Sequence, residues 1–286
     1  MENEIIQVSG SEMLEALNRS EIDMQIATAH KLPRDIGKCK QNMIELAAMD
    51  DSVAYNCFYH LERTDKNGQK AVIEGPSVRF TEIISACWGN LRIAGRIVAN
   101  DGKTITAQGI CHDLESNVAY QTEVKRSILT SKGYTYSQDM QVVVGNAAVA
   151  IAQRNAINKV VPQVLIKSVV DEVKRKAADH IAKVGVGESW KQWVAYMQQQ
   201  YHVTEAMMLD YLGKQREQLT VEDIQTMVGV NNAISEGTTT VEETFKKPKE
   251  QEQIAQQAQQ AALDAQAKAQ QAMSRSQGKK GTEAKK

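Results

Sequence analysis

The segment that decides the fold reads LRIAGRIVAN (91–100), KTITAQGICHDL (103–114) and VAYQTEVKRSI (118–128). Each run contains the alternating, often β-branched residues of a strand, and the runs are separated by Asn100-Asp101-Gly102 and Glu115-Ser116-Asn117. Short connections made of turn-forming residues are typical of an antiparallel meander. The sequence therefore predicts a three-stranded antiparallel sheet over residues 91–128.

Predicted helices come directly before and after this sheet. GPSVRFTEIISACWGN (75–90) has apolar residues at helical spacing, opens with Gly-Pro and closes with Gly-Asn, a pair suited to a helix start and a helix end. After a polar loop (130–140), residues 143–161 are apolar over most of a helical circumference, which indicates burial, and Pro162 ends the pattern. The expected fold class is α+β, an antiparallel meander packed against helices.

The remaining sequence predicts the division of the chain. Residues 1–25 carry six acids against one arginine and read as a loosely held lead-in with at most a short helix. The α+β core takes residues 26–166, with a helix over 36–48 and a strand over 53–63. A helical C-terminal region follows over 167–245. From residue 246 to 286 the chain is Gln, Ala, Lys and Glu without aromatics, a composition that predicts a disordered tail.

Composition bears on the cellular compartment in which the protein is expected. The four cysteines (Cys39, Cys57, Cys87 and Cys111) are scattered without a C-x-x-C pair, which argues against a zinc site and a disulfide framework and fits reduced thiols. The first residues lack the pattern of a signal peptide, and no apolar run approaches the roughly 18 residues that span a bilayer. We therefore expect a cytoplasmic protein, in the host cytoplasm if a phage encodes it, with no membrane partner.

The catalytic motifs of common enzyme classes are missing from the sequence. It contains no G-x-x-x-x-G-K-[ST], no G-x-S-x-G and no H-E-x-x-H. His112-Asp113 beside Glu115 is the best candidate for a metal corner, and the alternative is a strand end followed by a polar turn. We expect no enzyme activity, no cofactor, no metal and no catalytic residue.

The basic residues of the core gather in a few places. Arg92 and Arg96 lie four apart on one predicted strand and so share a face of the sheet. Arg154 interrupts an apolar helix, where a cation is costly unless an anion meets it. One interpretation is a groove between sheet and helix that neutralises a phosphate backbone, and the other is a solvated sheet face with internal ion pairs. The candidate DNA-binding residues are Arg79, Arg92, Arg96, Lys125, Arg126, Lys132 and Arg154, with Tyr134 as a base-stacking residue.

The order of these elements resembles the core of phage single-strand annealing proteins, a group that includes RecT, Erf and their eukaryotic Rad-type relatives. The features that carry the resemblance are a helix ending in Trp-Gly-Asn (88–90), three meandering strands, a polar loop, and the alanine-rich helix AAVAIAQRNAINKVVP (147–162). In that group a β-β-β-α unit follows a helix that ends on a glycine-aromatic signature. The resemblance covers about residues 75–165, with HKLPR (30–34) as a further point of similarity.

The resemblance implies ATP-independent binding and annealing of single-stranded DNA in phage-type homologous recombination, by an oligomeric ring or filament of this chain. It makes single-stranded DNA and further copies of the chain the expected partners. The helical C-terminal region and the tail become candidates for docking a host single-strand-binding protein, and a phage exonuclease is a further expected partner. The alternative is a phage structural or assembly protein, a scaffold- or adaptor-like oligomer without nucleic-acid activity.

Overall fold

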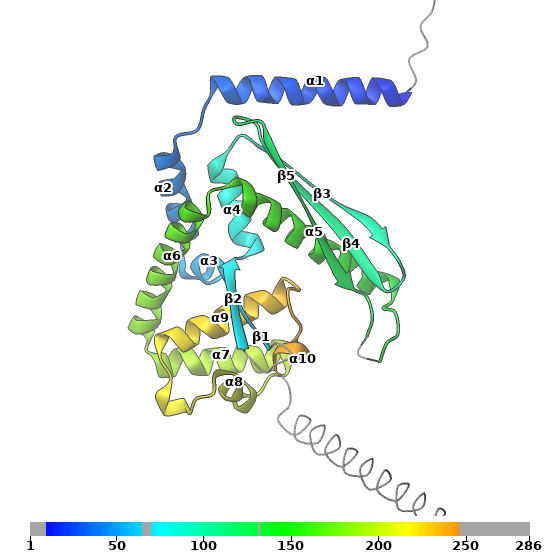
Figure 1. Cartoon of the computed structure of the whole chain (residues 1–286). Helices are drawn as coiled ribbons and strands as arrows, with labels where there is room; N and C mark the ends of the chain where they lie inside the picture. The colour runs from blue at the N-terminus through cyan, green and yellow to red at the C-terminus, as the bar shows by residue number, and fades with distance from the viewer. Residues whose placement is uncertain (1–9, 65–69, 131, 246–286) are drawn as a thin grey trace, which may run out of the picture. The chain divides into compact units, whose positions relative to one another are not determined.

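The computed structural model describes residues 10–64, 70–130 and 132–245 of the 286-residue chain. Figure 1 shows its elements, which in chain order are α1 (Gly10–Lys31), α2 (Ile36–Ala47), α3 (Asp51–Tyr55), β1 (Phe58–Thr64), β2 (Lys70–Pro76), α4 (Val78–Trp88), β3 (Leu91–Asn100), β4 (Thr104–Asp113), β5 (Val118–Ser127), α5 (Gln138–Val160), α6 (Gln163–Val184), α7 (Val186–Tyr201), α8 (Glu205–Leu212), η1 (Arg216–Gln218), α9 (Val221–Ser235) and α10 (Val241–Thr244).

The three-stranded sheet is an antiparallel meander, which confirms the prediction from the sequence. β4 lies in the centre and pairs with β3 on one side and β5 on the other. The register places Gly95 of β3 opposite Gly109 of β4, and Gly109 opposite Thr122 of β5. Tight connections hold this register, because Asp101 accepts hydrogen bonds from the backbone N–H groups of Lys103 and Thr104.

Helix α5 packs along one face of this sheet (Figure 1), and glycines allow the close approach. A Cβ atom at Gly109 would lie 2.2 Å from the carbonyl carbon of Ala152. The Thr122 hydroxyl donates a hydrogen bond of 2.7 Å to the carbonyl oxygen of Ala152. Backbone and small side chains, among them Ala107 and Ala148, fill the space between α5 and the centre of the sheet.

The main apolar core is formed where α2, α4, α6 and α9 meet. Phe80, Ile84 and Trp88 of α4 are buried in one cluster with Val169 and Val173 of α6. Burying each side chain of this size contributes about 1.5–3 kcal/mol, so this cluster contributes more apolar stabilisation than the small alanine cluster between α5 and the sheet. Side-chain caps start three of these helices, α2, α4 and α9; the Ser77 hydroxyl, for example, accepts the N–H of Phe80 at 3.0 Å.

The hairpin of β1 and β2 forms a separate two-stranded sheet that packs on α9 through β1. Gly229 of α9 lies against His60, where a Cβ atom would come within 2.6 Å of the His60 Cβ. The Asn232 side chain donates hydrogen bonds to the carbonyl oxygens of Tyr55 and Phe58, at 2.6 and 2.7 Å. These contacts fasten α9, which is late in the sequence, to the beginning of the core.

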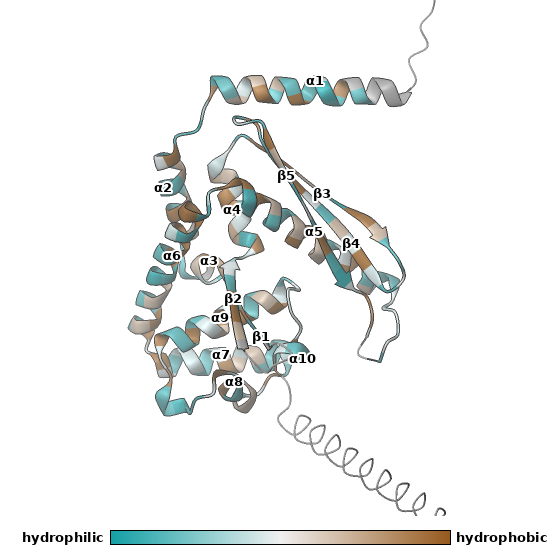
Figure 2. Cartoon of the chain, viewed as in Figure 1, coloured by the Kyte–Doolittle hydropathy of each residue, from teal (hydrophilic) through white to brown (hydrophobic). Residues whose placement is uncertain are grey.

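Several element boundaries differ from the prediction for local reasons. Pro76 ends β2 instead of opening α4, because Ser77 is the N-cap. The strand predicted over 53–63 divides into α3 and β1, because Asp50 caps α3 by accepting the N–H of Val53 at 3.0 Å. The acidic lead-in predicted over 1–25 is helical from Gly10 and continues as α1 to Lys31. Figure 2 shows hydrophilic and hydrophobic residues mixed along α1.

The described part of the chain forms two compact units. The first unit extends to Trp193 and also includes Leu219–Thr240, so it contains α6 and α9 as well as the sheet. Of the described residues, the second unit contains Val194–Gln218 and residues 241–245. Within it, the rings of Tyr211 and Phe245 lie 5.6 Å apart. The tail predicted over 246–286 lies outside the described residues.

Candidate nucleic-acid interface

The two faces of the three-stranded sheet are chemically different. Gly95, Gly109 and Thr122 face α5, so the residues that alternate with them point to the other side. We call that side the open face. Its residues are Arg92, Ala94 and Arg96 of β3, Thr104, Thr106, Gln108, Ile110 and His112 of β4, and Ala119, Gln121, Glu123, Lys125 and Ser127 of β5.

Three of the predicted DNA-binding residues share the open face. Arg92 and Arg96 project from β3, as their four-residue spacing predicted, and Lys125 projects from β5 opposite Thr106. Arg96 is exposed and its Nε donates to Oε1 of Gln108 at 3.2 Å. Lys125 is 65% exposed and reaches the Asp101 carboxylate at 3.9 Å. Arg96 and Lys125 are therefore accessible to a ligand on this side of the sheet, whereas Arg92 is 34% exposed and pairs with Glu21 at 3.0 Å.

The rest of the open face is mostly uncharged. Among the described strand residues that form it, Glu123 is the one acid, and threonine, glutamine and alanine predominate. Small and amide side chains place hydrogen-bond donors and acceptors beside the cations. Among these strand residues only Glu123 would repel a polyanion, whose phosphates would find both charge and hydrogen-bond donors.

Lys132 and Tyr134 extend this arrangement at one end of the sheet. Both side chains are exposed, Tyr134 to 71%. The loop that carries them is tied to the β3–β4 turn by a 3.0 Å hydrogen bond from the Thr135 hydroxyl to the carbonyl oxygen of Gly102. That turn also carries Asp101, the neighbour of Lys125. The predicted stacking residue and the predicted loop lysine thus lie at the Lys125 end of the sheet.

Arg126 lies on the opposite face from Lys125, because adjacent strand residues alternate. Its guanidinium donates to the carbonyl oxygens of Gly237 and Thr238, just after α9. These bonds fix the turn that follows α9, so the structure gives Arg126 a structural role in that turn. Arg126 and Lys125, both candidate DNA-binding residues, therefore lie on opposite faces of the sheet.

Arg154 also has an anionic partner inside the protein. Its side chain is 6% exposed, lies 3.3 Å from the Glu236 carboxylate and stacks 4.6 Å from the centre of the Tyr59 ring. Burial raises the pKa of Glu236, although the N–H of Val78 and the charge of Arg154 favour its ionised form. Of the two interpretations that the sequence left open for Arg154, the structure shows the internal ion pair.

Part of the space expected to form a groove between the sheet and the helix is occupied. Its central part is filled where Gly109 meets Ala152, and the arginines on that side, Arg126 and Arg154, hold the chain after α9. Arg79 lies exposed on α4, outside the sheet, where its charge acts on Glu236. Arg92, Arg96 and Lys125 thus lie on the open face, Arg126 and Arg154 are bonded to α9 and the turn after it, and Arg79 lies apart from both groups.

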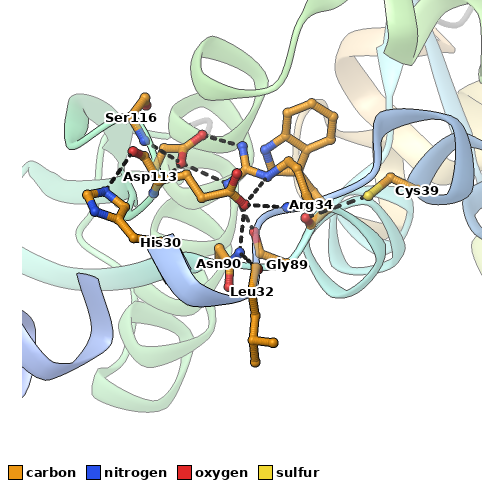
Figure 3. A network of polar contacts seen from close by, with 10 residues as sticks. His30, Leu32, Arg34, Cys39, Gly89, Asn90, Asp113 and Ser116 are labelled. Carbon is orange, nitrogen blue, oxygen red and sulfur yellow. Dashed lines mark hydrogen bonds and ion pairs between the residues drawn. The ribbon is translucent and has the colours of Figure 1, made fainter. Parts of the chain in front are cut away.

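A polar network that sequence reasoning missed closes one end of the sheet (Figure 3). Arg34, 10% exposed in its side chain, forms ion pairs with Asp113 at 2.5 Å and with Glu115 at 2.9 Å, and its guanidinium lies 4.6 Å from the centre of the Trp88 ring. Asn90 donates to Glu115 Oε1 at 2.6 Å. The network joins the segment before α2 to the ends of α4 and β4.

This network explains the acidic pair that the sequence offered as a metal corner. Burial alone would raise the pKa of Asp113, but the Arg34 guanidinium and the backbone N–H of Ser116 hold it below its ordinary value. Both carboxylates are satisfied by a cation of the chain itself. Across residues 10–64, 70–130 and 132–245, no group of three or more His, Cys, Asp or Glu side chains is placed to hold a metal ion. The polar strand end, the second interpretation, is what the structure shows.

Comparison with protein-family models, with curated proteins and with solved structures found no match to this chain. Within the part of the chain that the structure describes, each helix is too short or too polar to cross a bilayer.

Proposed function

We propose that this chain binds single-stranded DNA on the open face and promotes the annealing of complementary strands without ATP. The observation that carries the proposal is the grouping of Arg92, Arg96 and Lys125 on one sheet face whose other described strand residues include a single acid, Glu123. The order of elements adds support, because it resembles that of phage annealing proteins. Oligomers of this chain and the expected recombination partners belong to the same proposal.

The chemistry of annealing fits this kind of surface. Annealing breaks no covalent bond, so the protein has to hold one strand by its phosphates and leave the bases free to pair. Cations at intervals along a strand do this without reading sequence, and Tyr134 offers an aromatic face to a base at the end of the surface. Repetition of the surface in an oligomer multiplies weak contacts into tight binding.

The first test is binding of a labelled oligo-dT, measured by fluorescence anisotropy over a salt series. Each phosphate contact contributes about 0.7 to the slope of log affinity against log salt for a single strand, so three contacts give a slope of about −2. Affinity should then fall about 20-fold between 50 and 200 mM salt. For Arg96→Gln or Lys125→Gln the slope should be smaller by about 0.7.

A matched control comes from α6. Lys167→Gln removes a lysine of similar exposure, paired with Asp171 at 2.7 Å, from a helix remote in sequence from the open face. It should leave both affinity and salt slope unchanged. Tyr134→Ala should weaken binding without changing the slope, because stacking involves no counterion. Equal effects of Lys125→Gln and Lys167→Gln would contradict the assignment of the open face.

The second test is function. Annealing of complementary oligonucleotides should be faster with the protein than without it, and adding ATP should change nothing. The three open-face substitutions, Arg92→Gln, Arg96→Gln and Lys125→Gln, should slow annealing in proportion to the affinity that each loses. Absence of oligo-dT binding at about 50 mM salt would remove the proposal.

An assembly protein is the second candidate function, and one observation favours it. Val142 and Val143 of α5 are 60% and 57% exposed, and Ile97 and Val98 of β3 are 48% and 42% exposed. The two segments lie side by side, since a Cβ at Gly145 would meet the Ile97 side chain at 2.8 Å. Exposed apolar side chains in one place suit contacts between copies. A stable oligomer that ignores nucleic acid at low salt would support this candidate.

A further inference from the structure

Helix α1 makes an ionic contact with the open face. Oε1 of Glu21 lies 3.0 Å from Nη1 of Arg92, and Oε1 of Gln25 accepts from the same nitrogen at 3.3 Å. Figure 1 shows α1 running past the end of the sheet. The Glu21 carboxylate is thus paired with one of the three cations to which the proposed function assigns phosphate binding.

The contact between α1 and the rest of the protein is weak along the helix. Ala29 is fully buried, whereas Ile22 and Ile26 are half-buried and Leu17 and Met24 are 62% and 65% exposed. The ion pair itself is solvated, with Arg92 34% and Glu21 51% exposed. Pairs of this kind contribute little to stability. A ligand that competes for Arg92 therefore loses little free energy in breaking the Glu21–Arg92 ion pair.

The C-terminal end of α1 is held much more firmly. The His30 ring bonds the carbonyl oxygen of Glu115 at 3.1 Å, and Asn90 donates to the carbonyl oxygen of Leu32 at 2.9 Å. Arg34 follows directly, with its buried pairs to Asp113 and Glu115 (Figure 3). The helix is consequently anchored at one end and loosely held along its length, which is the arrangement of an arm on a hinge.

The sequence of α1 gives this arm an acidic character. GSEMLEALNRSEIDMQIATAHK (10–31) contains four acids against one arginine and one lysine. A strand of DNA approaching the Arg92 end of the open face would meet this excess negative charge as well as the Glu21 carboxylate.

We propose that α1 is an acidic arm that regulates the open face by competing with nucleic-acid phosphate for Arg92. In the free protein Glu21 neutralises Arg92, and a bound strand displaces the arm while the Arg34 network keeps it attached. Small anions that contact Arg92 alone would then fail to displace Glu21. Binding would favour strands long enough to engage Arg96 and Lys125 as well. This inference rests on the proposed function of the open face.

Glu21→Gln tests the arm with little risk to folding, because Glu21 is exposed. Loss of the competing carboxylate should raise the affinity for oligo-dT about two- to five-fold at 50 mM salt, the range of a solvated ion pair. The matched control is Glu15→Gln, which removes the same charge from the same helix. Glu15 is 66% exposed and pairs with Arg19 at 2.9 Å, within α1. Glu15→Gln should change affinity less than Glu21→Gln.

Hydrogen exchange adds a readout that direct DNA contact would not give. On addition of oligo-dT, the amides of residues 17–25 should exchange faster, while those of residues 34–39 keep their protection. Equal affinities of wild type, Glu15→Gln and Glu21→Gln, or equal gains in both variants, would overturn the arm and leave the proposed function intact. No oligo-dT binding by any of the three proteins would overturn both.

Discussion

Gly109→Ala examines the contact that sets the two faces of the sheet apart. The added Cβ would lie 2.2 Å from the carbonyl carbon of Ala152 and 2.3 Å from its oxygen. Ordinary contact begins at 3.4 Å, so α5 would have to recede by about 1.2 Å. Because the obstacle is helix backbone, no side-chain rotation can relieve the clash.

The expected size of the effect follows from two opposing contributions. Overpacking of a close-packed contact costs about 1–3 kcal/mol, and a backbone clash belongs at the upper end. Replacing glycine by alanine in a strand returns about 0.5–1 kcal/mol. The net loss in the free energy of unfolding is about 2 kcal/mol, which lowers the Tm by about 4–8 °C for a unit of this size.

Thermal and urea unfolding followed by circular dichroism measure this loss, and Gly95→Ala provides the control. Gly95 is the cross-strand partner of Gly109, but a Cβ there meets the side chains of Val149 and Gln153, at 2.7 and 2.9 Å, which can rotate away. Gly95→Ala should therefore cost less than about 1 kcal/mol. Equal stability of wild type and Gly109→Ala, or a larger loss for Gly95→Ala, would refute the close packing of α5 on the sheet.

Three further predictions concern buried groups. Glu236→Gln should lower the free energy of unfolding by about 3–5 kcal/mol, because it leaves Arg154 buried without its anion, and adding Arg154→Met should restore most of the loss in a urea titration. In the native protein at pH 8, Cys57 and Cys111 should resist a thiol reagent, because burial raises the pKa of each to about 12. Both should react in urea, and mass spectrometry of the labelled protein measures the difference. Asp113 has a lowered pKa, so its contribution to stability is complete above about pH 4 and is lost on further acidification. The difference in Tm between wild type and Asp113→Asn should therefore narrow from pH 7 to pH 3. A constant difference would contradict the ion pair with Arg34.

The sequence carried enough information for the sheet and for part of the open face. Strand alternation and turn residues are local signals, and they placed all three strands of the meander. The spacing of Arg92 and Arg96 also predicted their common face, because side chains in a strand repeat every two residues. The same rule places Lys125 and Arg126 on opposite faces of the sheet.

Helix boundaries near capping residues were harder to predict. Gly-Pro at 75–76 is compatible with either a strand end or a helix start, and Ser77 decides between them by capping α4. The mixed residues of α1 give no continuous apolar stripe (Figure 2), so the sequence did not indicate a helix that continues to Lys31. In both places the local pattern is compatible with more than one structure.

What the sequence by itself determined is the order of elements, the meander and the presence of basic residues in it. Only the tertiary structure decided which of those cations are accessible, because that depends on ion-pair partners far away along the chain. Arg154 meets Glu236 and Arg92 meets Glu21, 82 and 71 residues distant. Arg34 likewise finds Asp113 from 79 residues away. Charge pairing acts through space, and a local pattern contains no record of which segments the apolar core will bring together.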